Sequence, residues 1–301
     1  MSQKYHQFRG TGVAMVTPFN EKGDVDYDRL TRHTDRLINN GVDYLVALGT
    51  TAETPTLSKQ EKHDIVKCIV GTADGRIPVV VGAGGNNTAE VVETVRSMNI
   101  DGINGILSVA PYYNKPAQEG LYQHFSAISA VSEWPVILYN VPGRTGCNIS
   151  ADTVCRLASD FGDKIVGIKE ASCDFIQIMQ ILKNKPENFL VISGDDAMAL
   201  PMIALGGSGV ISVIANAYPA LFSTMIASAL NGSYEKAREI HYLLLPMINA
   251  IFKEGNPAGV KTAMEIQGYI HNVLRLPLIC ASDPLHRHIK ELHKIIQEKQ
   301  R

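Results

Sequence analysis

Eight short apolar segments, each rich in Val, Ile and Gly, recur along the 301-residue chain with helical segments between them. They follow one another at intervals of about 20 to 35 residues, the length of one β-strand, loop and helix. Several, including PVVVGAGG and LVISG, are apolar without alternation, as expected of parallel strands covered on both faces. We therefore predict an α/β fold, a closed (β/α)8 or TIM barrel, with strands at Gly12–Phe19, Tyr44–Gly49, Pro78–Gly84, Gly105–Ala110, Val136–Val141, Ile165–Glu170, Leu190–Asp195 and Gly209–Ala215.

The segments between these strands carry helix signals. Apolar residues recur at helical spacing over residues 27–38. Ser58 with Glu61, and Asn87 with Glu90, have the residue types and spacing of N-terminal capping pairs. Because these pairs follow the second and third strands, they place GTTAETPTL and GAGGNN in loops on the barrel face where enzymes of this fold keep their catalytic residues.

The chain continues beyond the eighth strand for longer than one closing helix requires. Ser233–Phe252 is periodic, Asn256 and Pro257 break the pattern, and a further helix is expected from about Gly259 to Tyr269. We predict a catalytic barrel over residues 1–230 and a helical extension packed on it over residues 231–301.

Composition excludes several classes of protein. Lys plus Arg (28) nearly balances Asp plus Glu (30), and no basic block is long enough to follow a phosphate backbone, so we expect no nucleic-acid partner. No segment approaches the roughly 18 apolar residues that span a bilayer, and the first ten residues lack an apolar signal-peptide core. We therefore expect no membrane association and a cytoplasmic location.

Cysteine and histidine spacing offers little support for a metal site. The five cysteines are scattered and never form C-x-x-C, so we interpret them as free thiols. His286 and His288 are close in sequence, but they follow Pro284 at the start of a charged helical stretch, which favours a solvated helix start. We predict no metal ligands.

The most informative residue is Lys169, in IVGIKEAS at the end of the sixth strand. Gly167 lies on the same face of that strand, which suits the open mouth of a barrel. Burial disfavours the charged ammonium form, so a lysine held there supplies the neutral amine that attacks ketones. The alternative is an ordinary surface lysine at a strand end.

Two further residues follow the fifth strand, in ILYNVPGRTG. Tyr139 at the strand tip can move the protons that imine formation requires. Arg144, in the loop after it, can pair bidentately with a substrate carboxylate. The alternatives are a tyrosine at the rim of the core and a loop arginine in a surface ion pair.

Hydroxyl groups also gather after the second and fourth strands. Thr50 and Thr51 in LGTTAE can hold a small carboxylate without a metal, although such turns are more often helix caps. Tyr112 and Tyr113 in APYYNKP project in different directions from a loop restricted by prolines. They could serve packing, an interface or the proton path.

Taken together and in order, GTTAETPTLS, APYYNKPAQEGLYQHF, ILYNVPGRTGCNI, GIKEAS, SGDDA and GGSGVISVIAN cover almost the whole chain. In these motifs the chain resembles the dihydrodipicolinate synthase family. That family belongs to the pyruvate-dependent class I aldolases, which also include N-acetylneuraminate lyase. The resemblance implies condensation of pyruvate with L-aspartate-4-semialdehyde in the diaminopimelate route of lysine biosynthesis.

The resemblance also implies roles for individual residues. Lys169 would form the imine with pyruvate and Tyr139 would relay protons. Thr51 would help to hold the pyruvate carboxylate, while Thr50 would link Tyr139 to Tyr113 of a neighbouring subunit. Because Tyr113 crosses between subunits in this family, the resemblance implies an assembly of at least two chains, commonly a homotetramer built as a dimer of dimers.

Three more positions match the family's substrate pocket. Arg144 would bind the carboxylate of the aldehyde, and Gly194 and Ile211 would line the pyruvate pocket. Sialate lyases generally have an uncharged residue at the position of Arg144, so we favour condensation over sugar-acid cleavage. The remaining alternative is a non-catalytic pyruvate-binding paralogue. In the implied reaction the protonated imine is the electron sink, so no cofactor is expected.

The chain departs from the family pattern at two motifs. The usual GTTGE is GTTAE here, so Ala52 must have an ordinary negative φ, and NPIPVK is NPAGVK, which has no functional explanation at this stage.

The family's lysine feedback site matches a few polar and aromatic positions of this chain. Asn86, Glu90 and Tyr112 correspond to members of that site, but Lys59 and Lys62 replace its histidines and would repel a cationic effector. Feedback inhibition by L-lysine is therefore a hypothesis.

Overall fold

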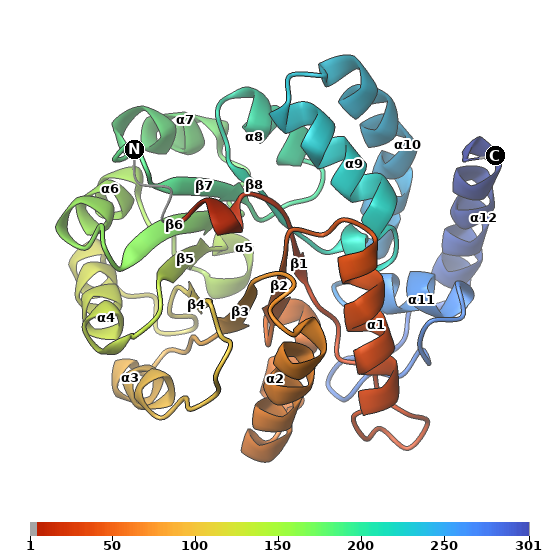
Figure 1. Cartoon of the computed structure of the whole chain (residues 1–301), viewed down its shortest axis with the longest axis horizontal. Coiled ribbons are helices and arrows are strands. Elements are labelled where there is room, and N and C mark those ends of the chain that lie inside the picture. The colour runs from red at the N-terminus through yellow and green to blue at the C-terminus, as the bar shows by residue number, and fades with distance from the viewer. Residues whose placement is uncertain (1–4, 301) are drawn as a thin grey trace.

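The computed structural model describes residues 5–300, and eight parallel strands form a closed barrel at its centre (Figure 1). Each strand pairs with the next along the chain, and β1 closes the barrel against β8. This confirms the predicted (β/α)8 architecture. The strands are β1 (Gly10–Ala14), β2 (Tyr44–Ala47), β3 (Val79–Gly82), β4 (Gly105–Val109), β5 (Val136–Asn140), β6 (Ile165–Glu170), β7 (Leu190–Ser193) and β8 (Gly209–Ser212).

Helices surround the barrel, as Figure 1 shows. The principal ones are α1 (Tyr27–Asn39), α2 (Lys59–Ala73), α3 (Thr88–Arg96), α4 (Gln118–Val131), α6 (Ala151–Asp160), α7 (Phe175–Asn184), α8 (Ala199–Ala204) and α9 (Pro219–Leu230). The short α5 (Pro142–Thr145) interrupts the loop after β5. Single turns of 3-10 helix occur at η1 (His6–Phe8), η2 (Thr50–Ala52), η3 (Thr54–Thr56) and η4 (Ile214–Asn216).

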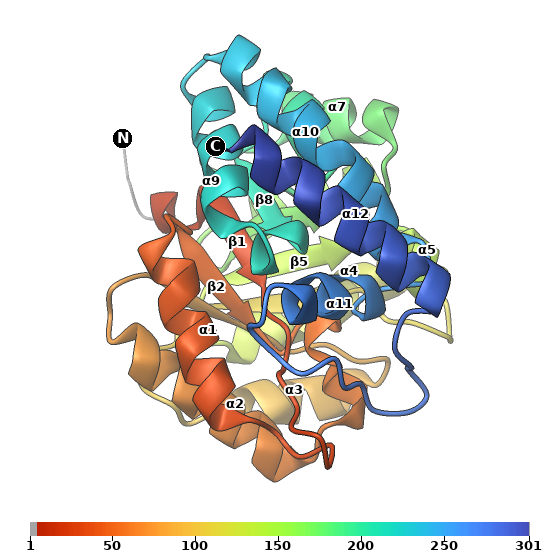
Figure 2. The same cartoon turned by 90° about the vertical axis from the view of Figure 1, so that its right-hand side faces the viewer.

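Three helices follow the last strand–helix unit and confirm the expected C-terminal helical extension. They are α10 (Tyr234–Phe252), α11 (Ala258–Ile266) and α12 (Asp283–Lys299), and α12 packs across both α10 and α11 (Figure 2). Not one of the helices within residues 5–300 is long and apolar enough to cross a membrane.

The predicted helix starts agree with the structure. Ser58 and Glu61 form a reciprocal capping box at the start of α2. At the start of α3, the Asn87 side chain accepts from the backbone of Ala89 and donates to the Glu90 carboxylate. The two capped helices follow the loops after β2 and β3.

Several strands end earlier than predicted, and the largest differences are at β1 and β8. β1 stops at Ala14 rather than Phe19, because the backbone N–H of Val16 donates to the Asn216 side chain instead of to a neighbouring strand. β8 stops at Ser212 rather than Ala215, because the buried Asp196 carboxylate accepts the N–H groups of residues 213 and 214 and turns the chain into η4. Side-chain acceptors replaced ladder partners at both places.

Buried side chains fill two separate layers. The larger lies between the strands and the surrounding helices. The smaller fills the barrel interior and consists of Phe8, Ala14, Tyr44, Val46, Val80, Leu107, Ile137, Tyr139, Val141, Val166, Leu190, Ile192 and Ile211. Two of the predicted site residues, Tyr139 and Ile211, therefore belong to the barrel interior.

Candidate active site

Lys169 and Tyr139 meet inside the carboxyl end of the barrel. They are register partners on β6 and β5, and the Lys169 Nζ atom lies 4.3 Å from the centroid of the Tyr139 ring. Lys169 is 5% exposed and Tyr139 is 6% exposed. The surface-lysine alternative is therefore wrong, and an amine and a phenol lie side by side in a buried site.

A register shift in the sheet helps to place this lysine. Val136 pairs with Ile165, but the next residue, Ile137, pairs with Gly167, so β6 carries one extra residue there. Such an irregularity changes which side chains face inward beyond it. Lys169 thereby points to the same interior as Tyr139.

Gly194 borders the aliphatic part of Lys169. It follows β7 directly, and a Cβ built on it would lie 3.1 Å from Lys169 Cε and 2.6 Å from Ala171 Cβ. Ile211 on β8 is 1% exposed and belongs to the barrel interior with Tyr139. Gly194 therefore lies beside the lysine side chain, and Ile211 lies in the barrel interior.

A pocket of about 560 Å³ is bordered by Tyr139 and by the loops after β2, β4 and β5. Besides Tyr139, three predicted site residues line it: Thr50, Tyr112 and Arg144. Arg144 is exposed, and its place in α5 directs it to the pocket rather than to a surface ion pair. A phenol, an arginine and hydroxyl groups thus surround a space that suits a small anionic substrate.

The loop of residues 49–53, called here the GTTAE loop, leaves β2 as a single turn of 3-10 helix. Ala52 has no positive φ, which confirms the expected conformation, and the left-handed position is Glu53, with φ of 55°. Thr51 is 1% exposed, and its Oγ1 accepts a 2.9 Å hydrogen bond from Asn256 Nδ2.

A buried ion pair anchors the same loop from the C-terminal side. Lys261 Nζ lies 2.5 Å from Glu53 Oε1, and both side chains are fully buried. Burial lowers the pKa of Lys261 to about 8, against the raising effect of Glu53. The backbone N–H of Arg275 donates to the other oxygen of Glu53. Residues of the C-terminal extension thus hold Glu53 in its left-handed backbone conformation.

Three comparisons identify the family. Residues 7–299 match the model of the dihydrodipicolinate synthetase family. A 4-hydroxy-tetrahydrodipicolinate synthase of Parabacteroides distasonis is 50% identical over 284 residues, which cover 94% of this chain and 95% of that protein. The dihydrodipicolinate synthase structure from Thermotoga maritima is 41% identical with a TM-score of 0.94, covering 97% of this chain and 99% of that one. The chain belongs to the dihydrodipicolinate synthetase family.

Sequence reasoning did not find all the residues of this family member's site. Asn256 and Lys261 come from NPAGVK, where the Asn-Pro pair indicates only a helix break. Asn256 lines the pocket, and Lys261 holds the GTTAE loop. The available signal was a lysine in an otherwise apolar helix start, because a buried charge requires a partner.

A second buried group follows Lys169 at the end of β6. The Glu170 carboxylate, 1% exposed, accepts hydrogen bonds from Asn140 Nδ2, Gln177 Nε2 and the backbone N–H of Ser172. These donors satisfy a charge that faces away from the barrel interior. The network fixes the end of β6 immediately after Lys169.

Other predicted site residues lie apart from Lys169 within one chain. Tyr113 is 89% exposed with φ of 75°, and it does not line the pocket. Asn86 accepts from Asn114 through its backbone carbonyl, and Glu90 accepts from Asn87. Of the three candidate effector residues, Tyr112 reaches the pocket, and it is 44% exposed.

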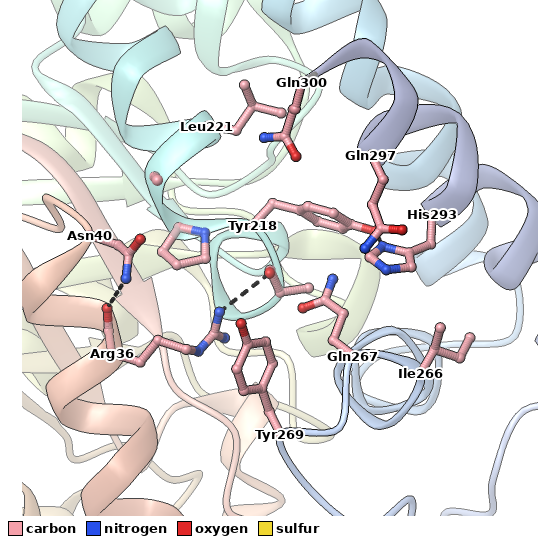
Figure 3. Close-up of a pocket in the computed structure, with 13 residues that line it drawn as sticks. Arg36, Asn40, Tyr218, Leu221, Ile266, Gln267, Tyr269, His293, Gln297 and Gln300 are labelled. Carbon is pink, nitrogen blue, oxygen red and sulfur yellow. Dashed lines mark hydrogen bonds between the residues drawn. The ribbon is translucent and has the colours of Figure 1, made fainter.

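A second pocket, of about 390 Å³, lies between α1, α9, α12 and the segment after α11 (Figure 3). Arg36 donates to the backbone carbonyls of Asn216 and Ala217, and its guanidinium lies 3.8 Å from the centroid of the Tyr269 ring. Figure 3 shows Arg36 beside the Tyr269 ring, with a dashed line that marks its hydrogen bond to the Ala217 carbonyl. Its contacts join α1 to the barrel end, and this pocket holds none of the predicted site residues.

Within residues 5–300, no group of three or more His, Cys, Asp or Glu side chains is placed to hold a metal ion. All five cysteines are free, which confirms the interpretation of scattered thiols. His286 pairs with Glu265 near the start of α12, in agreement with a solvated helix start.

Proposed function

We propose that this chain is a 4-hydroxy-tetrahydrodipicolinate synthase, a lyase that condenses pyruvate with L-aspartate-4-semialdehyde in the diaminopimelate route of lysine biosynthesis. The observation that carries this proposal is the buried amine of Lys169 beside the Tyr139 ring, at the carboxyl end of the barrel. The synthase name of the relatives and family membership support it.

The first step forms a covalent bond between the lysine and the keto acid. Lys169 Nζ attacks the ketone carbon of pyruvate, and Tyr139 returns a proton to the oxygen so that it leaves as water. Loss of a methyl proton from the resulting iminium converts it into an enamine. The enamine carbon then adds to the aldehyde, whose oxygen takes up a proton.

The last step releases the enzyme. The amino group of the condensed product displaces Lys169 from the imine carbon by transimination, which closes the ring. Because the protonated imine accepts the electron pair throughout, we propose that the reaction needs neither a metal nor an organic cofactor.

The polar groups around the pocket have complementary roles in this scheme. Thr51 binds the pyruvate carboxylate and Thr50 joins the proton path of Tyr139. Arg144 binds the carboxylate of the semialdehyde through its planar guanidinium. Gly194 and Ile211 leave room for pyruvate beside Lys169.

We also propose that the chain acts as a homotetramer, a dimer of dimers. The support is Tyr113, a predicted member of the proton path that is 89% exposed in the single chain and so requires a neighbouring subunit to reach a site. A related structure, 41% identical with a TM-score of 0.94, is described as a monomeric variant. In this assembly, residues 1–230 form the catalytic barrel and residues 231–301 the extension.

The compartment and the effector site are further parts of the proposal. Five free thiols suit a reducing compartment, which supports the cytoplasm. Asn86, Glu90 and Tyr112 form the candidate site for L-lysine. Lys62 and Tyr112 line the same pocket, so the charge of Lys62 opposes a cationic effector. Titration calorimetry with millimolar L-lysine tests this site, and the absence of binding heat would remove it.

Borohydride reduction in the presence of pyruvate tests the central step. Peptide mapping should find the reduced adduct on Lys169, and Lys169→Ala should show neither adduct nor condensation. A label on another lysine would overturn the mechanism. Comparing turnover of the semialdehyde with cleavage of N-acetylneuraminate separates the two lyase activities, and adduct formation without turnover of either substrate would indicate a non-catalytic pyruvate-binding protein.

A further inference from the structure

Asn256 reaches the active-site pocket from outside the eight strand–helix units. It lies in the turn between α10 and α11, it is 7% exposed, and it lines the same pocket as Tyr139 and Arg144. Its Nδ2 donates to Thr51 Oγ1 across 205 positions of sequence. A residue of the C-terminal extension therefore contacts a loop of the barrel within the site.

The chemistry of the two side chains determines where the hydroxyl hydrogen of Thr51 can go. A threonine hydroxyl has one hydrogen and two lone pairs, whereas an amide nitrogen only donates. Because Asn256 Nδ2 occupies one lone pair of Thr51 Oγ1, the threonine hydrogen is not used in their bond. It remains for another acceptor, and a carboxylate oxygen is a strong acceptor.

The Oδ1 atom of the Asn256 amide also indicates a binding role. This atom is buried and has no hydrogen-bond partner among the described residues. Buried acceptors in proteins are nearly always paired. An unpaired acceptor beside a pocket is placed to receive a donor from a bound molecule.

The position of Asn256 is itself fixed by the buried ion pair described above. Lys261 lies in α11, which begins two residues after Asn256, and Glu53 lies two residues after Thr51. The Lys261–Glu53 contact therefore holds together the two segments that carry the amide and the hydroxyl. Geometry of this kind keeps a donor aligned before substrate arrives.

We propose that Asn256 is a positioning residue, which orients the Thr51 hydroxyl as a donor to the carboxylate of the keto-acid substrate. The inference rests on the proposed function of Thr51 in pyruvate binding. It makes the C-terminal extension a part of substrate recognition.

Steady-state kinetics of the full-length Asn256→Ala and Asn256→Asp variants test the proposal, with pyruvate and the semialdehyde varied separately. Asn256→Ala should raise the KM for pyruvate about tenfold, because the hydroxyl loses its orientation. Asn256→Asp should raise it further, since a carboxylate accepts the Thr51 hydrogen and repels the substrate anion. The KM for the semialdehyde should change less than about twofold in both.

A purely structural role predicts the opposite order. Aspartate has the shape of asparagine, so Asn256→Asp would then be closer to wild type than Asn256→Ala, and that order would overturn the proposal. Asn272 provides a matched control. It also donates from Nδ2 to a threonine, Thr262, and has a buried unpaired Oδ1, but it does not line the pocket. Asn272→Ala should leave the KM for pyruvate unchanged.

A double-mutant cycle shows whether Asn256 acts through Thr51. In a Thr51→Val background, Asn256→Ala should add less than about a twofold change to the KM for pyruvate. Fully additive effects would overturn the inference. Borohydride labelling of Lys169 in the wild-type enzyme tests the proposed function independently. If Lys169 is labelled and the effects of the two substitutions are additive, the role of Asn256 is refuted while the proposed function stands.

Discussion

The amine of Lys169 lies 4.3 Å from the ring centroid of Tyr139 because the two residues are register partners on neighbouring strands. The backbone ladder, rather than a flexible loop, thus sets their separation. Catalytic groups on strands are held more firmly than groups on loops.

Tyr139→Phe should separate ring packing from proton transfer. The variant keeps the ring beside Lys169 and loses only the hydroxyl, so pyruvate should still be trapped on Lys169 by borohydride. The kcat should fall about 100-fold or more, the usual effect of a lost general acid–base group. A coupled assay of condensation measures it, and a wild-type kcat would exclude Tyr139 from the proton path.

Gly194→Ala should impair catalysis by moving the lysine. The added Cβ would lie 3.1 Å from Lys169 Cε and 2.6 Å from Ala171 Cβ, so a side chain must shift. Displacements of this size are expected to lower kcat on the order of 10- to 100-fold. Gly71→Ala is the control, since a Cβ there meets open space within α2. Equal activity of both variants would contradict the prediction.

Arg144→Ala should act on one substrate and spare the other. Loss of a hydrogen-bonded charge to a carboxylate should raise the KM for the semialdehyde roughly 10- to 100-fold. Because pyruvate is proposed to be held by Thr51 and Lys169, its KM should stay near the wild-type value. Both constants are measured from initial rates, with each substrate varied while the other is saturating. A selective change in the KM for pyruvate would contradict the proposal that Arg144 binds the semialdehyde.

Lys261→Met should destabilise the fold by about 3–5 kcal/mol, because it leaves the carboxylate of Glu53 buried without its cation. Urea unfolding monitored by circular dichroism measures the change. Adding Glu53→Gln removes the orphaned charge, so the double variant should recover part of the loss. A double variant less stable than Lys261→Met would argue against a coupled pair.

The Glu61–Arg275 pair should make stability depend on pH. Hydrogen bonds from Arg275 lower the pKa of Glu61 to about 2, below its ordinary 4.5. A carboxyl with a lowered folded-state pKa stabilises the fold above its unfolded pKa and loses that contribution as the pH falls to the folded value. The Tm difference between wild type and Glu61→Gln should therefore be largest near neutral pH and shrink between 4.5 and 2. A Tm difference that stays constant over this pH range would show that ionisation of Glu61 in the ion pair does not contribute to stability.

Much of the fold was predictable because its signals are local. Strand-length apolar runs, helical periodicity and caps such as Ser58 act over a few residues, and the structure contains the corresponding elements. The errors at the ends of β1 and β8 have a different origin. There, the side chains of Asn216 and Asp196 accept hydrogen bonds from backbone N–H groups that the predicted strands would have paired with a neighbouring strand. No local sequence signal marks those bonds.

By itself, the sequence determined the barrel and placed an amine at the end of its sixth strand, since strand periodicity and the cost of burying Lys169 are properties of a short segment. Only the tertiary structure decided which residues hold the GTTAE loop at the pocket. Asn256 meets Thr51 across 205 positions and Lys261 meets Glu53 across 208. Such contacts depend on how the C-terminal helices pack against the barrel, and packing of distant surfaces leaves no periodic trace in either segment.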